Sequence, residues 1–333
     1  MNILGIESTA HTFGVGIVTD KGEVLANATD SYTSEDVGMI LDKVAEHHNK
    51  VAEKVLKQAL EEAKVNWEDI EFIAYSAGPG LDPVLWAGYH IAKKLANDNN
   101  KKLVGINHCC AHLSIGKVYN KLKDPCYIYV SGVNTQVIVE EGGHYRVMGE
   151  TLDIGLGNML DKFGRILGLG FPAGPKIEQL AKSGKYVGLP YVVKGMDVCF
   201  SGVLTKSEQL LKKGSEKTKF SGTPRGQSPL VGISKEDLCF SMQETCFAML
   251  AEVTERAMAH NDKKELLLVG GVGANKRFCE MLDIMCKERG AKFFKVPMDL
   301  AGDQGAMIAW EGYLRRKEFA DIEVNPHWRT DEV

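Results

Sequence analysis

The chain of 333 residues has a formal net charge of −4, and 44% of its residues are hydrophobic. This length favours two domains, and the charge excludes a general attraction to nucleic acid, so RNA or DNA binding needs a local basic patch or a partner. No apolar run reaches the about 20 residues of a membrane helix, and we expect no signal peptide, which indicates a cytoplasmic protein. The eight cysteines form no CxxC pair and are expected to be reduced thiols, mostly in the core.

The first third of the chain alternates strand-like and helix-like stretches. The turn Asp20-Lys21-Gly22 separates two apolar runs, which indicates a β-hairpin. Apolar residues between Ile40 and Leu60 recur at helical spacing. We expect, in chain order, three strands within 2–29, a helix at about 38–65, a strand at 70–80, a helix at about 84–98 and a strand at 102–108.

The second half of the chain begins with the same pattern. Residues 126–151 again read as strand, turn, strand, glycine turn and strand, and residues 265–282 repeat the strand, glycine break and helix of 70–88. Such internal similarity predicts two related α/β domains. The expected domains are residues 1–125 and residues 126–333, the second with an insertion at about 152–235 and a C-terminal helix and tail.

This duplication is typical of the actin-like (ASKHA) architecture, in which two α/β domains surround a nucleotide cleft lined by glycine turns. Two Rossmann-like domains are the alternative, but no GxGxxG follows the first strand. Residues 206–230 are rich in Lys, Gly, Ser and Pro and are expected to form an exposed, mobile insertion. The tail, residues 318–333, is expected to be irregular.

His108 and His112 lie four positions apart in NHCCAHLSIG, so a helix places both imidazoles on one face. The pair is either a metal clip or two histidines that only share a helix face. A metalloprotease HExxH motif needs a glutamate after the first histidine, where this chain has Cys109. A metal site here therefore needs further ligands from elsewhere in the chain.

Tyr129 and Asp303 are oxygen donors near the edges of the expected cleft. Two imidazoles, a phenolate and a carboxylate would suit iron or zinc. The alternative makes Tyr129 an ordinary strand residue and Asp303 the N-cap of a helix at 304–317. Neither of these structural roles excludes ligation.

Two glycine turns are candidates for a nucleotide site. The turn within VSGVNTQ (130–136) offers Ser131, Gly132 and Asn134, and GGVGAN (270–275) lies between a strand and a helix. Backbone N–H groups in such turns can hold an anion, and the N-terminus of a helix adds a favourable dipole. Each turn alone is commonly structural, but their occurrence at equivalent places in a duplicated fold indicates a nucleotide.

Further polar residues stand near these turns. Within 157–181, Asp161 lies on a short expected helix and Glu178 lies one turn into the next one. Their carboxylates can accept ribose hydroxyls, whereas the alternative is a surface helix–turn–helix with solvated charges. In the first hairpin turn, Glu7 and His11 are candidates for substrate contact.

Seven motifs occur in order along essentially the whole chain: GIESTAHTFGVGIV, NHCCAHLSIG, YVSGVNTQV, GFPAGPKIEQLA, KGMDVCFSG, GGVGANKRF and DQGAMIAW. In these motifs the sequence resembles the universal tRNA threonylcarbamoyladenosine synthesis family, in its archaeal and eukaryotic form, the catalytic subunit of the KEOPS complex. The resemblance implies an ASKHA fold and a metal-dependent acyltransferase. Its reaction moves threonylcarbamoyl from threonylcarbamoyl-AMP to N6 of adenosine 37 in tRNAs that read codons beginning with adenine.

The resemblance also implies site residues. The family's metal ligands correspond to His108, His112, Tyr129 and Asp303, which implies one iron ion per subunit, with zinc as the alternative. Its nucleotide- or adenylate-binding positions correspond to Tyr129, Ser131, Gly132, Val133, Asn134, Asp161, Gly174, Glu178 and Asn275, and imply ATP or an adenylate as ligand. Position 133 departs from the small residue that is commoner in the family, but no departure removes a metal ligand.

The implied partners are tRNA, a small atypical kinase that some archaea fuse to the C-terminus, a dimerising subunit and an accessory subunit. A local basic patch for tRNA would draw on Lys93, Lys94, Lys101, Lys102 and the lysines of 206–219, with solvated surface lysines as the alternative. Two other functions compete with the transferase. One is a metal-containing actin-like ATPase or scaffold without transferase activity, and the other is a metalloprotease.

Overall fold

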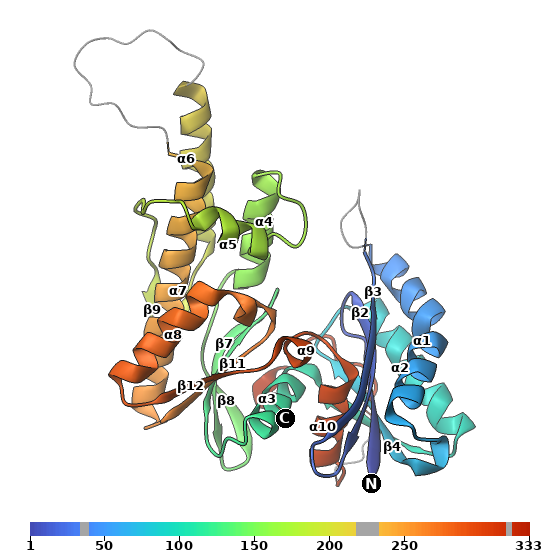
Figure 1. The fold of residues 1–333 in the computed structure, drawn as a ribbon. Coiled ribbons are helices and arrows are strands. Elements are labelled where there is room, and N and C mark those ends of the chain that lie inside the picture. The colour runs from blue at the N-terminus through green and yellow to red at the C-terminus, as the bar shows by residue number, and fades with distance from the viewer. Residues whose placement is uncertain (34–39, 218–232, 318–321) are drawn as a thin grey trace, which may run out of the picture. The chain divides into compact units, whose positions relative to one another are not determined.

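A computed structural model of the chain describes residues 1–33, 40–217, 233–317 and 322–333. Packing divides the chain into two compact units, whose elements are labelled in Figure 1. The domain limits expected from the sequence stay a prediction beside this division. The first unit comprises Met1–Lys123, Glu141–Arg146 and Val296–Val333, and the second comprises Asp124–Glu140 and Val147–Lys295.

The first unit contains a five-stranded sheet with helices on both faces. Its elements are β1 (Asn2–Glu7), β2 (Thr12–Thr19), β3 (Val24–Ser31), α1 (Leu41–Ala63), η1 (Trp67–Asp69), β4 (Ile70–Gly78), α2 (Asp82–Asp98), β5 (Lys102–Asn107), α3 (His108–Tyr119), α9 (Met298–Ala301), α10 (Gly305–Leu314) and η3 (Thr330–Glu332). The strand order is β3-β2-β1-β4-β5. The strands β1 to β3 pair antiparallel, whereas β1, β4 and β5 pair in parallel.

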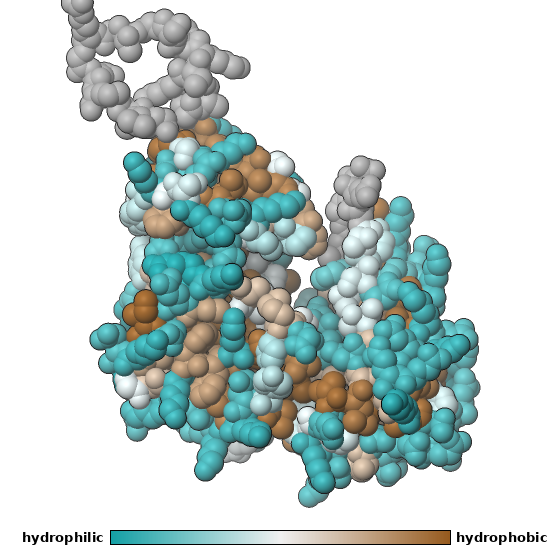
Figure 2. Space-filling model, viewed as in Figure 1, coloured by the Kyte–Doolittle hydropathy of each residue, from teal (hydrophilic) through white to brown (hydrophobic). Residues whose placement is uncertain are grey.

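Figure 1 shows α1 and α2 on one face of this sheet and α10 on the other. Because both faces are covered, β1 and β2 are buried along almost their whole length. The helix α1 is amphipathic, with Val44, His48, Val55 and Ala59 buried along one stripe. Its outer side is hydrophilic, as the teal surface over α1 in Figure 2 shows.

Glycines allow α10 to lie directly on β1 and β2. A Cβ added at Gly5 would lie 2.2 Å from the backbone oxygen of Gly305, and one at Gly16 would lie 2.0 Å from the backbone nitrogen of Ala306. Contacts this short leave no room for a side chain, so backbone meets backbone. The N-terminal end of α10 is therefore held closely against the sheet, together with the residues that precede it.

The second unit contains another five-stranded sheet, a two-stranded sheet and a layer of helices. Its elements are β6 (Cys126–Val130), β7 (Thr135–Glu141), β8 (His144–Glu150), α4 (Leu156–Ile166), α5 (Gly174–Ala181), β9 (Val193–Lys194), β10 (Asp197–Val198), α6 (Ser201–Lys217), α7 (Lys235–His260), β11 (Glu265–Val269), η2 (Gly271–Ala274), α8 (Lys276–Glu288) and β12 (Lys292–Lys295). The helices α4 to α8 pack with β6 and β7 around one hydrophobic core. The tip of the β7–β8 hairpin is counted with the first unit.

The two large sheets have the same topology. In the first, β2 and β3 lie on one side of β1, and β4 and β5 lie on the other. In the second, β7 and β8 lie on one side of β6, and β11 and β12 lie on the other. The first strand of each sheet pairs antiparallel with its hairpin partner and parallel with its other neighbour. This correspondence confirms the duplicated α/β pattern that the sequence predicted.

One local prediction was wrong, and so was one of the alternatives. Residues 206–217 of the expected mobile insertion belong to α6, because Leu210 and Leu211 follow Val203 at helical spacing and pack against the core of the second unit. The rest of that segment, 218–230, lies outside the described residues. The N-cap of α10 is Gln304 rather than Asp303, since the Gln304 side chain accepts the backbone N–H of Met307 at 3.0 Å.

Other predictions agree with the structure. All eight cysteines are free, and six of them are buried. The tail is irregular over 322–333 apart from η3, and 318–321 lie outside the described residues. Among the helices that the structure describes, none combines the length and apolarity needed to cross a bilayer.

Candidate functional site

Three side chains predicted as metal ligands meet in the first unit. His108 and His112 lie on the first two turns of α3, which begins directly after β5. Asp303 lies immediately before the N-cap of α10. One ligand atom from each of the three lies within 4.8 Å of the other two. We call these three residues the metal triad.

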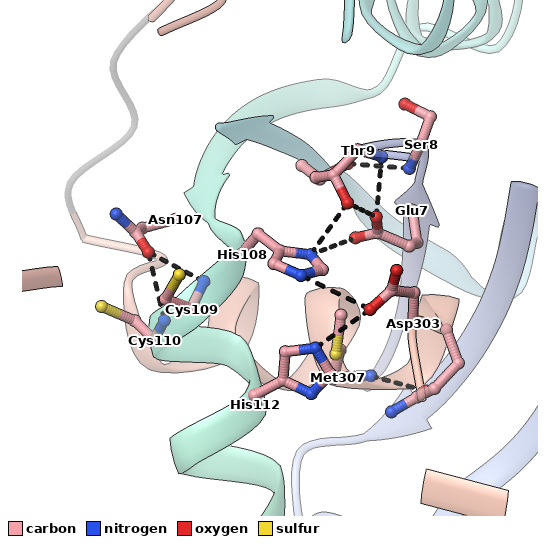
Figure 3. A network of polar contacts seen from close by, with 12 residues as sticks. Glu7, Ser8, Thr9, Asn107, His108, Cys109, Cys110, His112, Asp303 and Met307 are labelled. Atoms are coloured by element: carbon pink, nitrogen blue, oxygen red, sulfur yellow. Dashed lines mark hydrogen bonds and ion pairs between the residues drawn. The ribbon is translucent and has the colours of Figure 1, made fainter. Parts of the chain in front are cut away.

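Both imidazoles turn the same nitrogen toward Asp303, as Figure 3 shows. The Nε2 atom of His112 lies 3.2 Å from Oδ1 of Asp303, and the Nε2 atom of His108 lies 3.5 Å from it. The two rings meet edge to face, with centroids 4.7 Å apart. Two imidazole nitrogens and one carboxylate oxygen form a donor set typical of non-haem iron(II), and zinc accepts the same donors. The residues present therefore fit a divalent metal.

Glu7, at the end of β1, holds His108 from behind. Its Oε2 atom lies 3.0 Å from Nδ1 of His108, and its Oε1 atom accepts the backbone N–H and the hydroxyl of Thr9. The Glu7 side chain has no exposed surface. A carboxylate on the far nitrogen of a metal-binding histidine fixes the orientation of the ring. In the structure the Glu7 carboxylate contacts His108 and Thr9. Its contact with substrate stays a prediction.

The charges of the cluster act strongly on one another because they are buried. Burial lowers the pKa of His108, but the carboxylates of Glu7 and Asp303 outweigh it and raise that pKa to about 9. Burial likewise lowers the pKa of His112 and dominates there. Burial raises the pKa of Asp303, but His108 and His112 outweigh it and hold that pKa well below its usual range.

The charge of His11 adds a smaller lowering of the Asp303 pKa, after burial and the two other histidines. Its role as a substrate contact stays a prediction. With two carboxylates against the buried imidazoles, the metal triad and Glu7 form a site that attracts a cation.

Asp303 is positioned by contacts that bridge long stretches of chain. Asn27 on β3 donates its side-chain N–H to the backbone oxygen of Asp299 at 3.3 Å and accepts the backbone N–H of Ala306, also at 3.3 Å. These bonds fasten the chain on both sides of Asp303. The capping bond of Gln304 and the close packing of α10 on the sheet complete the support.

Three supporting residues were missed or given another role by the sequence analysis. Asn107, the N-cap of α3, accepts the backbone N–H groups of Cys109 and Cys110 at 2.9 and 3.1 Å (Figure 3). An asparagine just before an expected helix is a known N-cap signal and could have revealed it. Nothing local signals Asn27, because its partner Ala306 is 279 positions away. Glu7 was recognised as polar and near the cleft, but its bond to His108 spans 101 positions.

Tyr129, the predicted fourth metal ligand, lies on β6 of the second unit. The metal triad belongs to the first unit alone. Ligation by Tyr129 therefore stays a prediction.

The turn between β6 and β7, residues 131–134, is closed by its own hydrogen bonds. The backbone N–H of Ser131 donates to the oxygen of Asn134 at 2.8 Å, and the N–H of Asn134 donates to the Ser131 hydroxyl at 3.1 Å. The backbone oxygens of Ser131 and Gly132 accept N–H groups from the first turn of α4. The side chain of Val133 is 70% exposed. The turn thus directs its carbonyls into the unit and its outer edge toward solvent.

The other predicted nucleotide residues fall into two groups in the second unit. Asp161 on α4 accepts the backbone N–H of Ala173 at 2.8 Å, next to Gly174 at the start of α5. Burial raises the pKa of Asp161, although the bond from Ala173 opposes this effect. A Cβ at Gly174 would meet nothing within 4 Å, so the space beside its backbone is open.

Glu178 and Asn275 meet at the start of α8. Glu178 accepts the backbone N–H of Lys276 at 2.9 Å. Asn275 is the N-cap of α8, accepts the N–H of Phe278 at 3.0 Å and donates to Gln243 at 2.6 Å. Asp161 therefore contacts the N-terminal end of α5, beside Gly174. Glu178, on α5 itself, contacts the residue after Asn275. Their part in nucleotide binding stays a prediction.

Comparison with known proteins gives a consistent result. The model of the family described as tRNA N6-adenosine threonylcarbamoyltransferase matches residues 23–310. A protein of that name from Thermococcus kodakarensis is 51% identical over 100% of this chain and 98% of its own length. A probable bifunctional tRNA threonylcarbamoyladenosine biosynthesis protein from Methanobrevibacter smithii is 46% identical over 99% of this chain, which covers 59% of that longer protein.

Among solved structures, HypF from T. kodakarensis superposes with a TM-score of 0.61 at 14% identity, over 96% of this chain and 48% of that one. This likeness concerns the fold alone, and it agrees with the ASKHA architecture expected from the duplicated sheets. The sequence similarity extends over the full length of the chain and identifies the family, which the fold alone does not. The chain belongs to the tRNA N6-adenosine threonylcarbamoyltransferase family.

Proposed function

We propose that this protein transfers a threonylcarbamoyl group from threonylcarbamoyl-AMP to N6 of adenosine 37 in tRNAs that read codons beginning with adenine. The observation that carries the proposal is the 51% identity to a relative of that name over essentially both whole chains. The metal triad of His108, His112 and Asp303 supports it, because it lies in two of the motifs on which the family resemblance rests.

The metal is proposed to be one iron(II) ion per subunit, with zinc as the alternative. His108, His112 and Asp303 would hold it, and Tyr129 is the proposed fourth ligand. When bound, such an ion supplies Lewis acidity toward a carbonyl or phosphoryl oxygen. This role needs no activated water, which agrees with a cysteine at position 109 where hydrolytic HExxH enzymes have a glutamate. Glu7 would keep Nε2 of His108 directed at the ion.

The proposed nucleotide contacts use atoms that remain available in the second unit. The turn of Ser131 to Asn134 would present the backbone N–H groups of Gly132 and Val133 to phosphate, since neither makes a hydrogen bond within the described part of the chain. Asp161 and Glu178 each commit one oxygen to a backbone N–H, which leaves the second oxygen for a ribose hydroxyl. Asn275 keeps the second hydrogen of its amide for the adenine end.

In the proposed transfer the N6 amine attacks the carbamoyl carbon of the adenylate. The new C–N bond forms as the bond from that carbon to the phosphate oxygen breaks, and AMP leaves with the bonding electrons. The amine then loses one proton. Because the exocyclic amine is a weak nucleophile and AMP a good leaving group, the main task of the protein is to hold both reactants in line.

We further propose that tRNA is bound together with partner subunits, namely a small atypical kinase, a dimerising subunit and an accessory subunit, in the cytoplasm. The formal charge of −4 favours a shared binding surface, since phosphate backbones repel an acidic protein. The relatives named bifunctional are longer than this chain, which is consistent with a fused partner in those organisms.

The test is a reconstituted reaction. The protein, with its partner subunits, receives threonylcarbamoyl-AMP and a tRNA that reads codons beginning with adenine, and the nucleosides are then analysed by mass spectrometry. We expect the modified adenosine, and its loss when a chelator strips the metal. No modified adenosine from metal-loaded protein would overturn the proposal. Nucleotide binding that is indifferent to the chelator, without product, would favour an actin-like scaffold instead.

A further inference from the structure

The C-terminal tail, residues 322–333, packs along the first unit as a strap that turns at 325–328, where the N–H of Trp328 donates to the oxygen of Asn325 at 3.2 Å, and ends in η3. Every second side chain from 322 to 330 is partly or fully buried, and those between them are exposed. The inward residues Ile322, Val324 and Trp328 pack against the hydrophobic core of that unit. The strap therefore has an apolar face of its own and is held by more than its backbone.

Backbone hydrogen bonds fasten the strap to the end of β4 and to the loop that follows it. The N–H of Asn325 donates to the oxygen of Ala77 at 2.7 Å, and the N–H of Gly80 donates to the oxygen of Pro326 at 3.2 Å. A Cβ at Gly78 would lie 1.8 Å from the oxygen of Asn325, so only glycine permits this approach. The chain next to β4 is thus shaped to receive the strap.

The strap ends at the start of the metal-binding helix. The side-chain amide of Asn107 donates to the backbone oxygens of Trp328 and Arg329 at 3.3 and 3.2 Å. The oxygen of the same amide accepts the N–H groups of Cys109 and Cys110, the first turn of α3. Asn107 is 2% exposed, so both halves of its amide depend on these partners.

This arrangement admits one orientation of the Asn107 amide. The strap offers only carbonyl oxygens, which need the NH₂ group, and the helix offers only N–H groups, which need the oxygen. Without the strap, the amide would lose its partners on one side and could rotate away from the helix. The first turn of α3, which carries His108, would then lose its N-cap and become less ordered. His112 lies on the next turn of the same helix and would be affected through it.

We propose that the docked tail is a positioning element for the metal centre: it locks the Asn107 cap and thereby the first turn of α3, and so sets the metal affinity of the histidine pair. The inference rests on the metal centre of the proposed function. It assigns a role to a segment that contains none of the proposed metal ligands or nucleotide contacts.

The test uses full-length Trp328→Ala, which removes the largest apolar anchor of the tail and leaves every residue of α3 in place. The dissociation constant for Zn²⁺ is measured by competition with a chromophoric chelator. We expect metal binding to weaken about ten-fold, the lower range for residues that support metal ligands. Trp328→Leu is the milder second variant, and we expect an intermediate loss.

The matched control is Trp67→Ala. Trp67 is also a partly buried tryptophan packed against the same hydrophobic core, but it lies on η1. It should lower the melting temperature comparably and leave the Zn²⁺ dissociation constant within about two-fold. Equal losses of affinity in both variants would reduce the effect to general stability and overturn the proposal.

A double-mutant cycle tests whether the tail acts through Asn107. If it does, Asn107→Ala combined with Trp328→Ala binds Zn²⁺ no more weakly than Asn107→Ala alone, because the lock is already absent. Independent losses that multiply in the double variant would contradict the proposed route.

Hydrogen exchange separates this inference from the metal assignment. In metal-free protein, the amides of Cys109 and Cys110 should exchange about ten-fold faster in Trp328→Ala than in the unaltered chain and in Trp67→Ala. Unchanged exchange at these amides would overturn the positioning role. If the unaltered protein bound no metal while exchange accelerated as expected, the metal centre would fall and the coupling of tail and helix would stand.

Discussion

The helices α3 and α10 both belong to the first unit, but α3 begins directly after β5 of that unit, whereas α10 follows β12 of the second unit and the short helix α9. They present the proposed metal donors in different ways. The helix α3 carries His108 and His112 within its own first turns, so local helix geometry sets their spacing. Before α10, Asp303 stands in irregular chain, and Asn27, Gln304 and the backbone of the sheet hold it there. The spacing of the two histidines is therefore set by local helix geometry, whereas the position of Asp303 is set by tertiary contacts.

Both helices also use a side-chain amide as N-cap, with different support. Asn107 is held by the tail on one side and by α3 on the other. Gln304 caps α10, but its Nε2 atom is buried and has no hydrogen-bond partner among the described residues. The comparison teaches that the N-cap amide of α3 has partners for both its oxygen and its NH₂ group, whereas among the described residues only the oxygen of the α10 cap has one.

The largest effect on metal affinity is expected from removing one of the two histidines on α3. His112→Ala removes one donor, and we expect Zn²⁺ or Fe²⁺ affinity to fall by more than about 100-fold, beyond the range for residues that only support a ligand. The fold should persist, as circular dichroism can check. The control is His90→Ala, an exposed histidine on α2. Retention of metal by His112→Ala at unaltered affinity would contradict the metal triad.

The next largest effect should come from the close packing of α10 against the sheet. In Gly16→Ala the new Cβ would meet the backbone of Ala306, so α10 must shift, and we expect a stability loss of about 3 kcal/mol. Because Asp303 precedes α10, metal affinity should fall as well. Gly188→Ala is the control, since a Cβ there meets nothing within 4 Å. Chemical denaturation and metal titration measure the two effects, and a neutral Gly16→Ala would refute this packing.

A sharper probe of the α3 end is Glu7→Gln, which keeps the shape and removes the charge behind His108. We expect metal affinity to fall about ten-fold, because a neutral amide holds the imidazole less firmly. The matched control is Glu311→Gln on α10, another buried glutamate, paired with Arg315 at 3.1 Å. It should cost stability and leave metal affinity within about two-fold. If the two variants behave alike in the metal titration, Glu7 does not orient the ligand.

The smallest effect should come from the cap of α10. Gln304→Ala removes the bond to the N–H of Met307, and we expect to lose about 1 kcal/mol of stability and a few-fold in metal affinity. Ser234→Ala, which removes the N-cap of α7 in the second unit, is the control. It should lose similar stability without any change in metal binding. A metal affinity of Gln304→Ala equal to that of Ser234→Ala would show that capping of α10 does not reach Asp303.

Much of the fold follows from local pattern. The hairpin turn around Gly22, the helix that became α1 and the strand that became β4 were each predicted within a few residues, because periodicity and turn residues act over short distances. The prediction of a mobile loop at 206–217 was wrong because it used composition alone. Leucines at helical spacing in this segment pack against the core of the second unit as part of α6. Asp303 was offered as a helix cap in the alternative view, and one residue of shift gave that role to Gln304.

The sequence by itself determined the duplicated α/β pattern, the family, and the pair of histidines one helical turn apart, since each of these depends on spacing along the chain. Only the tertiary structure decided that Asp303 faces this pair, that Glu7 holds His108, and that the tail reaches Asn107. These contacts join residues 101 to 222 positions apart. They depend on how sheets, helices and tail pack together, which no short-range pattern encodes.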